Sequence, residues 1–102
     1  MEEKISELKK FLIKTLNPNK IIIFGSRAKN ENKKFSDIDI CVVGSNKPDH
    51  TSVRKIKEEI DEILGIYSYD LIFWEDIDEE FKKIINSTGK VIYDKIGSNN
   101  RN

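Results

Sequence analysis

The stretch that decides the fold reads IIIFGSRAKNENKKFSDIDI and spans residues 21–40. Its first part, with Lys20, is a short β-branched run that ends at Phe24 and predicts a buried strand over residues 20–24. Its last part opens residues 38–43, where apolar side chains alternate between two faces and predict a second strand. Between the strands, Gly25-Ser26-Arg27 is separated from Asp37-Ile38-Asp39 by a polar loop. Both motifs therefore lie at strand ends.

Gly25 and Ser26 follow the apolar run directly, and we expect a sharp turn from the strand into a short helix that begins near Ser26. Such a turn exposes backbone N–H groups and the positive end of a helix dipole, which together attract phosphate. The simpler interpretation is a helix N-cap, because serine is favoured there. The two interpretations are compatible, since both use the same N–H groups. Arg27 is a candidate to touch phosphate or to hold carboxylates, and a surface arginine is the alternative.

Asp37 and Asp39 are separated by one residue, so on a strand they point to the same face, roughly 6–7 Å apart. Carboxylate oxygens are the ligands that hard divalent cations prefer, and such cations bridge to phosphate. Two like charges this close are costly unless a cation neutralises them. The pair therefore predicts a metal clamp, with two solvent-facing aspartates as the alternative.

Periodicity predicts the remaining elements. An amphipathic helix is expected over residues 2–16, because apolar residues recur there every three or four positions. A second helix is expected up to Leu64 with Gly65 as its C-terminal cap, and a third strand over residues 69–74. A capping-box spacing of Asp76 and Glu79 predicts the start of a further helix, which Gly89 ends. Val91–Tyr93 then adds an edge strand.

Strands separated by helices predict a small α/β (α+β) domain with helices packed on a sheet. Periodicity leaves open whether the strands run parallel. We expect one domain over residues 1–96 and a flexible tail over residues 97–102, which are rich in Gly, Ser and Asn.

Composition excludes several classes of protein. Hydrophobic residues make up 37% and charged residues 35%, with 18 basic and 18 acidic side chains. A zero net charge argues against stable non-specific binding of nucleic acid. No apolar run approaches the length of a membrane span, and the acidic start is unlike a secretory signal. One cysteine, Cys41, excludes an internal disulfide framework and fits a reducing cytoplasm, so we expect a cytoplasmic protein.

Asp70 is the candidate third carboxylate, because it lies near the start of a strand that can present it beside Asp37 and Asp39. Its alternative role is an ion pair with a lysine. Glu75 and Asp76 are rival acids, but they fall at the far end of that strand.

Four other side chains invite a functional interpretation that we do not favour. Cys41 is expected to pack in the core, because no histidine is placed to activate it. His50 is expected at the surface, and Tyr69 and Trp74 are expected to pack rather than to bind a base.

The sequence resembles the DNA polymerase β-like nucleotidyltransferase superfamily, and more closely its minimal nucleotidyltransferase (MNT) branch, whose members often act as antitoxins to HEPN-domain RNase toxins. The resemblance covers most of the chain. Its matching stretches are Ile22–Ala28, Ser36–Ile40, Tyr69–Ile72 and Gly89–Tyr93. One departure is Lys29-Asn30, where many relatives have Arg-Gly.

The resemblance implies a mixed sheet of the nucleotidyltransferase type and an Mg²⁺-dependent enzyme. In that family Asp37, Asp39 and Asp70 would be the catalytic, metal-binding acids for two ions. The resemblance further implies that Gly25, Ser26 and Arg27 bind the nucleotide, and that AMP passes from ATP to a hydroxyl, most often a tyrosine, of a HEPN toxin. The resemblance also implies that this chain forms a hetero-oligomer with the toxin.

Two alternatives stay open from the sequence. One is an antitoxin with weak or no turnover that neutralises the toxin by binding only. The other is a small-molecule nucleotidyltransferase of the aminoglycoside type, which is less favoured because such chains usually carry an added acceptor domain. The retention of three acids favours the enzyme.

Overall fold

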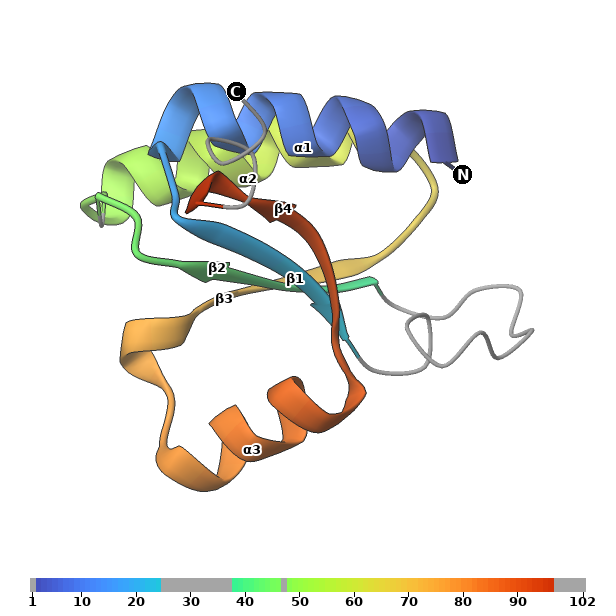
Figure 1. Cartoon of the computed structure of the whole chain (residues 1–102). Helices are drawn as coiled ribbons and strands as arrows, with labels where there is room; N and C mark the ends of the chain where they lie inside the picture. The colour runs from blue at the N-terminus through green and yellow to red at the C-terminus, as the bar shows by residue number, and fades with distance from the viewer. Residues whose placement is uncertain (1, 25–37, 47, 97–102) are drawn as a thin grey trace.

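The computed structural model describes residues 2–24, 38–46 and 48–96, and it arranges them as helices on both faces of one sheet (Figure 1). Within these ranges, no helix is long and apolar enough to cross a membrane. The elements, in chain order, are α1 (Glu2–Leu16), β1 (Lys20–Phe24), β2 (Ile38–Val43), α2 (His50–Leu64), β3 (Tyr69–Phe73), the 3₁₀ helix η1 (Trp74–Asp76), α3 (Glu79–Thr88) and β4 (Lys90–Asp94).

The sheet has four strands in the order β3-β2-β1-β4. β1 lies in the middle and pairs antiparallel with both β2 and β4. β2 and β3 run parallel. The sheet is therefore mixed, which confirms the expectation drawn from the family resemblance and answers the question that periodicity left open. β3 and β4 are the two edge strands.

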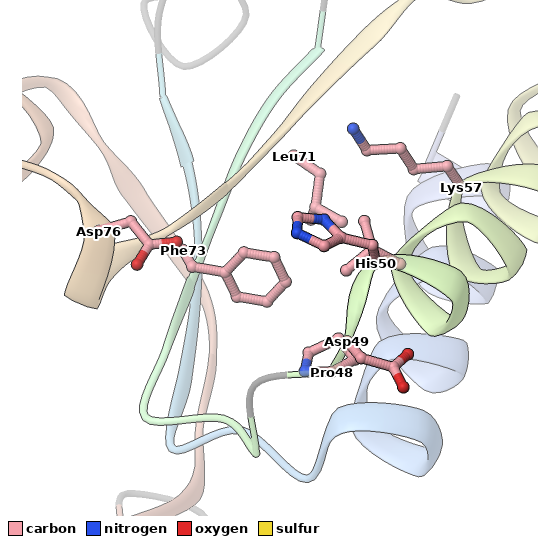
Figure 2. Close-up of a pocket in the computed structure, with 8 residues that line it drawn as sticks. Pro48, Asp49, His50, Lys57, Leu71, Phe73 and Asp76 are labelled. Atoms are coloured by element: carbon pink, nitrogen blue, oxygen red, sulfur yellow. The ribbon is translucent and has the colours of Figure 1, made fainter.

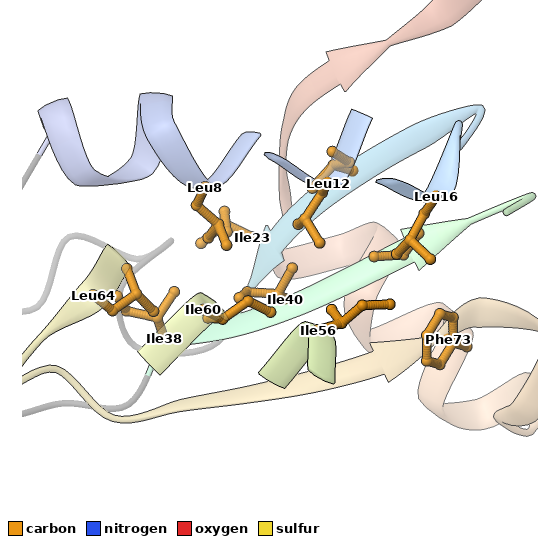
Figure 3. Packing of buried hydrophobic residues seen from close by; sticks show 12 residues of the cluster. Leu8, Leu12, Leu16, Ile23, Ile38, Ile40, Ile56, Ile60, Leu64 and Phe73 are labelled. Atoms are coloured by element: carbon orange, nitrogen blue, oxygen red, sulfur yellow. The ribbon is translucent and has the colours of Figure 1, made fainter. Parts of the chain in front are cut away.

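One face of the sheet is covered by α1 and α2, which lie side by side in Figure 1. The helices contribute buried leucine and isoleucine side chains at helical spacing, and β1 and β2 contribute alternate residues of each strand. Figure 3 shows these side chains meeting between the two layers. The cluster comprises Leu8, Leu12, Leu16, Ile21, Ile23, Ile38, Ile40, Val42, Ile56, Ile60, Leu64 and Phe73. The alternation predicted for residues 38–43 is thus confirmed.

The opposite face carries a smaller core beneath α3. It consists of Ile22 and Phe24 from β1, Cys41 from β2 and Ile85 from α3. The rings of Phe24 and Phe81 meet edge to face, with centroids 5.7 Å apart and planes at 81°, an arrangement that aromatic quadrupoles favour. Cys41 is fully buried, as the sequence predicted.

Both ends of α2 are capped, and the cap at Gly65 confirms the prediction. Asp49 is the N-cap, and its side chain accepts a hydrogen bond of 2.8 Å from the Ser52 N–H. This bond lowers the pKa of the Asp49 carboxyl below its usual value. At the other end, Gly65 adopts φ +64°, a conformation that glycine reaches without a Cβ penalty.

The predicted start of α3 is wrong by two residues. The N-cap is Asp78, whose carboxylate accepts the Phe81 N–H at 2.8 Å. Asp76 cannot cap this helix, because it belongs to η1 and the following Ile77 is extended. The third strand is also one residue shorter than predicted, since Trp74 opens η1 rather than ending β3. Gly89 ends α3 as expected.

Candidate functional site

Only some of the predicted site residues lie in the part of the chain that the structure describes. Asp39 is the second residue of β2, and Asp70 is the second residue of β3. The turn and helix predicted near Ser26, together with Gly25, Arg27 and Asp37, lie outside the described residues.

Asp39 and Asp70 are Cα partners in the parallel register of β2 and β3. The register runs without a break from Ile38 opposite Tyr69 to Val42 opposite Phe73. Neighbouring strands of a sheet are about 4.8 Å apart, and partnered residues point to the same face. The fold therefore brings together two carboxylates that are thirty-one positions apart in the sequence.

Both carboxylates point to the α3 face of the sheet. Asp39 is two residues from Cys41 on β2, and Asp70 is two residues from Ile72 on β3, so each acid shares the face of a residue that packs in the α3-side core. The cross-strand partner of Asp39 on its other side is Phe24. Asp39 is partly buried, whereas Asp70 is exposed. The pair thus has an aromatic neighbour on one side and an open sheet edge on the other.

Two described residues, Phe24 and Ile38, flank the stretch 25–37, which lies outside the described residues. Phe24 precedes Gly25 in the chain and is the cross-strand partner of Asp39. Ile38 follows Asp37 and opens β2, and its N–H donates to the Ser68 carbonyl at 2.9 Å. Phe24 and Ile38 lie at the same end of the sheet, so both flanks of the stretch adjoin the Asp39–Asp70 pair.

The chemistry of the pair suits a hard cation. Two adjacent carboxylates repel unless positive charge is placed between them, and oxygen donors suit Mg²⁺. Among the described residues, no group of three or more His, Cys, Asp or Glu side chains gathers in a way that could hold a metal ion. Asp39 is also engaged in an interaction with another group of the protein. The third predicted acid, Asp37, is not among the residues described.

The rival acids Glu75 and Asp76 lie at the opposite end of β3, in η1. Glu75 is occupied there: its Oε2 accepts the N–H of Gly44 at 2.9 Å, just after β2 ends. The preference for Asp70 over these residues therefore agrees with the geometry. The contact between Glu75 and Gly44 gave no signal in the sequence, because the two residues are far apart in the chain and Glu75 follows no helical or strand pattern.

Cys41 lies in the α3-side core, two residues beyond Asp39 on the same strand. Burial, and then the negative charge of Glu75, raise the pKa of its thiol to about 11. The thiol is thus protonated at neutral pH, and a protonated thiol is a poor nucleophile. This agrees with the predicted packing role.

Tyr69 is fixed in a structural role. Its hydroxyl donates to the Lys57 carbonyl at 2.9 Å. Burial, together with Asp61, raises the pKa of Tyr69 to about 12. Trp74 also packs, against the α3-side core, and the Lys82 ammonium lies 5.4 Å from the centre of its ring system. The prediction that both aromatic residues pack is confirmed.

A hollow of about 360 Å³ lies on the other face of the sheet, between β3 and the start of α2. Figure 2 shows His50, Leu71 and Phe73 gathered around it, with Lys57 above and Asp76 to one side. Leu71 and Phe73 alternate with Asp70 and Ile72, so the sheet separates this hollow from the carboxylates. His50 is exposed, as predicted. The hollow is not part of the candidate site.

Comparison with protein families gives a match over residues 6–96 to the family described as Polymerase beta, Nucleotidyltransferase. Two curated proteins are also similar to this chain. A probable protein adenylyltransferase, MntA, of Haemophilus influenzae is 29% identical over 93 residues, which cover 91% of this chain and 82% of that protein. A putative protein adenylyltransferase of Methanocaldococcus jannaschii is 36% identical over 72 residues, covering 71% and 83% respectively.

Solved structures show the same fold. A toxin–antitoxin crystal structure with AMP-PNP superposes with a TM-score of 0.71 at 24% identity, covering 91% of this chain and 73% of that one. A second structure is described as a tri-AMPylated Shewanella oneidensis HEPN toxin in complex with MNT antitoxin. It superposes with a TM-score of 0.73 at 17% identity and covers 97% of this chain and 76% of its counterpart.

Proposed function

We propose that this chain, which belongs to the polymerase beta nucleotidyltransferase family, transfers AMP from ATP to a hydroxyl group of a partner protein. The observation that carries the proposal is the register of Asp39 against Asp70 at the sheet end where the Gly25-Ser26 motif follows β1. The family supplies nucleotidyl transfer as the reaction. Curated relatives named as protein adenylyltransferases favour a protein as the acceptor.

The donor set fits a divalent cation such as Mg²⁺, because carboxylates are hard ligands and two of them lie on neighbouring strands. Asp39 and Asp70, with Asp37, would hold the cation. When bound, Mg²⁺ would neutralise phosphate charge and lower the pKa of the attacking hydroxyl. The resemblance implies two such ions.

The chain's own residues have three tasks in this reaction. Backbone N–H groups and the hydroxyl at Gly25 and Ser26 would bind the triphosphate, and Arg27 would lie against phosphate or the acids. Asp70, which is exposed on an edge strand, would take up the proton of the acceptor hydroxyl. Asp39, set deeper beside Phe24, would orient the nucleotide. A nucleotide analogue, AMP-PNP, is bound in one structure of the same fold.

The proposed partner is a HEPN-domain toxin, and the chain would act as its antitoxin in a hetero-oligomer in the cytoplasm. Support comes from structures of this fold that are described as complexes of an MNT antitoxin with a HEPN toxin. We further propose that residues 1–96 are a single minimal nucleotidyltransferase domain, which agrees with the extent of the family match.

The test is intact-protein mass spectrometry on a HEPN-domain toxin, the proposed partner, mixed with the chain, ATP and Mg²⁺. We expect the partner to gain one AMP unit less water, or a multiple of it. Asp70→Asn should abolish the gain while the two proteins still associate. Glu58→Gln, the same carboxylate-to-amide change at an exposed position of α2, should leave it intact.

The result also separates the enzyme from a binding-only antitoxin. An unmodified partner, with full neutralisation by the Asp70→Asn variant, would overturn transfer and support binding alone. Modification of an aminoglycoside, and not of the protein, would identify a small-molecule enzyme.

A further inference from the structure

β3 carries Asp70, yet its position depends on one neighbour. It is an edge strand of five residues that pairs with β2 alone. A strand whose register slips by one residue turns every side chain to the opposite face, and a slip of two moves each side chain about 6.6 Å along the strand. Either slip would separate Asp70 from Asp39. The two ends of the β2–β3 ladder therefore matter for the site.

Different groups accept the last hydrogen bond at the two ends of the β2–β3 ladder. At the start, the N–H of Ile38 donates to the main-chain carbonyl of Ser68 at 2.9 Å. N–H groups of alternate residues on a strand point to the same neighbour. Even-numbered residues of β2 thus direct their N–H groups to β3, while the carbonyl of Val43 accepts from Asn19 on the other side. Gly44 is the next even-numbered donor.

β3 offers no strand carbonyl at that level, because it ends at Phe73 and η1 begins with Trp74. The Glu75 side chain takes the vacant place: its Oε2 accepts the Gly44 N–H at 2.9 Å. Gly44 adopts φ +70°, and a Cβ there would collide with the Asn19 side chain. The position therefore favours glycine, and its N–H meets a carboxylate acceptor. Hydrogen bonds to ionised acceptors are stronger than those to neutral ones.

We propose that Glu75 is a positioning residue for nucleotidyl transfer: its carboxylate closes the β2–β3 ladder at Gly44 and so keeps Asp70 in register with Asp39. This inference rests on the proposed function, because it assigns Glu75 a role through Asp70. Glu75 itself lies at the far end of β3 and touches no reacting group.

Three substitutions separate reach, charge and acceptor chemistry at position 75. Glu75→Gln keeps the length and an acceptor oxygen but removes the charge. Glu75→Asp keeps the charge but shortens the reach, and Glu75→Ala removes both. The matched control is Glu80→Ala, which deletes an exposed carboxylate from the first turn of α3.

The first measurement is hydrogen exchange of backbone amides on the full chain. Glu75→Ala and Glu75→Asp should speed exchange at Gly44 and through β3 by about tenfold, since the closing bond is lost, whereas Glu75→Gln, which keeps a neutral acceptor, should give a smaller increase. Exchange in α1 should not change. Equal exchange at Gly44 in wild type and Glu75→Ala would overturn the proposal.

The second measurement is AMP transfer, with Mn²⁺ affinity by calorimetry as a readout that needs no acceptor. Glu75→Ala and Glu75→Asp should lower kcat and weaken Mn²⁺ binding by roughly three- to tenfold, with little change in KM for ATP. Glu75→Gln should change both values less than Glu75→Ala does. A merely structural role predicts a lower melting temperature with unchanged kcat and Mn²⁺ affinity in the folded protein, and that result would reject positioning.

Asp70→Asn tells the two failures apart. If wild type transfers no AMP, the proposed function fails; if Asp70→Asn leaves transfer and Mn²⁺ affinity unchanged, the role of Asp70 fails, and so does any positioning by Glu75. If Asp70→Asn loses both while Glu75→Ala and Glu80→Ala match wild type, only the inference about Glu75 fails.

Discussion

Asp39 of β2 and Asp70 of β3 lie side by side as Cα partners on neighbouring parallel strands. Phe24 occupies the corresponding partner position on the other side of Asp39. The carboxylate pair is therefore bounded by an aromatic side chain toward the middle of the sheet and by solvent toward its edge. The exposed position of Asp70 leaves it accessible to solvent.

Asp39→Asn should abolish Mg²⁺-dependent transfer while keeping the fold. Losing a cation ligand costs orders of magnitude in rate, and removing one of two neighbouring negative charges relieves repulsion. We expect activity to fall by about a thousandfold or more and the melting temperature to stay equal or rise slightly. Labelled-ATP incorporation and calorimetry check this. Full activity in Asp39→Asn would remove Asp39 from the cation site.

Gly25→Val should weaken ATP binding more than Ser26→Ala does. Backbone N–H groups remain in the serine variant, whereas a branched side chain at the glycine blocks close approach of a phosphate and disfavours the turn. Calorimetry with Mg²⁺ and ATP measures both affinities. The proposed phosphate cradle would be wrong if Gly25→Val bound ATP as tightly as wild type.

Asp78→Ala should destabilise the domain by about 0.5–2 kcal/mol, because the Phe81 N–H loses its capping partner at the start of α3. Asp78→Asn is the matched control, since asparagine caps about as well as aspartate. Urea unfolding followed by circular dichroism gives both free energies. An alanine variant as stable as the asparagine variant would contradict the assignment of Asp78 as the cap.

Stability should fall as the pH rises from about 9 toward 11, partly through Cys41. The folded thiol has a pKa of about 11, above its ordinary value of 9.0. The unfolded chain therefore releases this proton first, and the stabilising contribution of the protonated thiol is present below pH 9 and lost as the pH passes the folded value. Tyr69, with its pKa raised to about 12, acts in the same direction at higher pH.

The check compares the pH dependence of unfolding in wild type and Cys41→Ala. The alanine variant should be less stable at every pH, because it leaves a cavity, but its stability should fall less steeply between pH 9 and 11. Between pH 6 and 8 the two slopes should agree. Identical slopes over the alkaline range would show that the thiol titrates normally in the folded protein.

The secondary structure was largely predictable from the sequence. The spacing of Leu8, Leu12 and Leu16 marks the buried face of α1, and the alternation along residues 38–43 assigns each residue of β2 to its face. Gly65 and Gly89 mark two helix ends as expected. The cap of α3 was misplaced because two acids, Asp76 and Asp78, stand near the helix start, and only the 3₁₀ turn of η1 decides between them.

The sequence by itself determined the faces of the described strands and the positions of α1 and α2. It also supplied the Gly25-Ser26 and Asp37-Ile38-Asp39 motifs and Asp70 as the third candidate acid. These follow from side-chain period and local backbone chemistry, which act over a few neighbouring residues. Only the tertiary structure decided the strand order, the parallel pairing of β2 with β3, the register of Asp39 against Asp70 and the contact of Glu75 with Gly44. Those features depend on which distant segments pair when both faces of the sheet are buried, and a local pattern specifies a strand's faces without naming its neighbour.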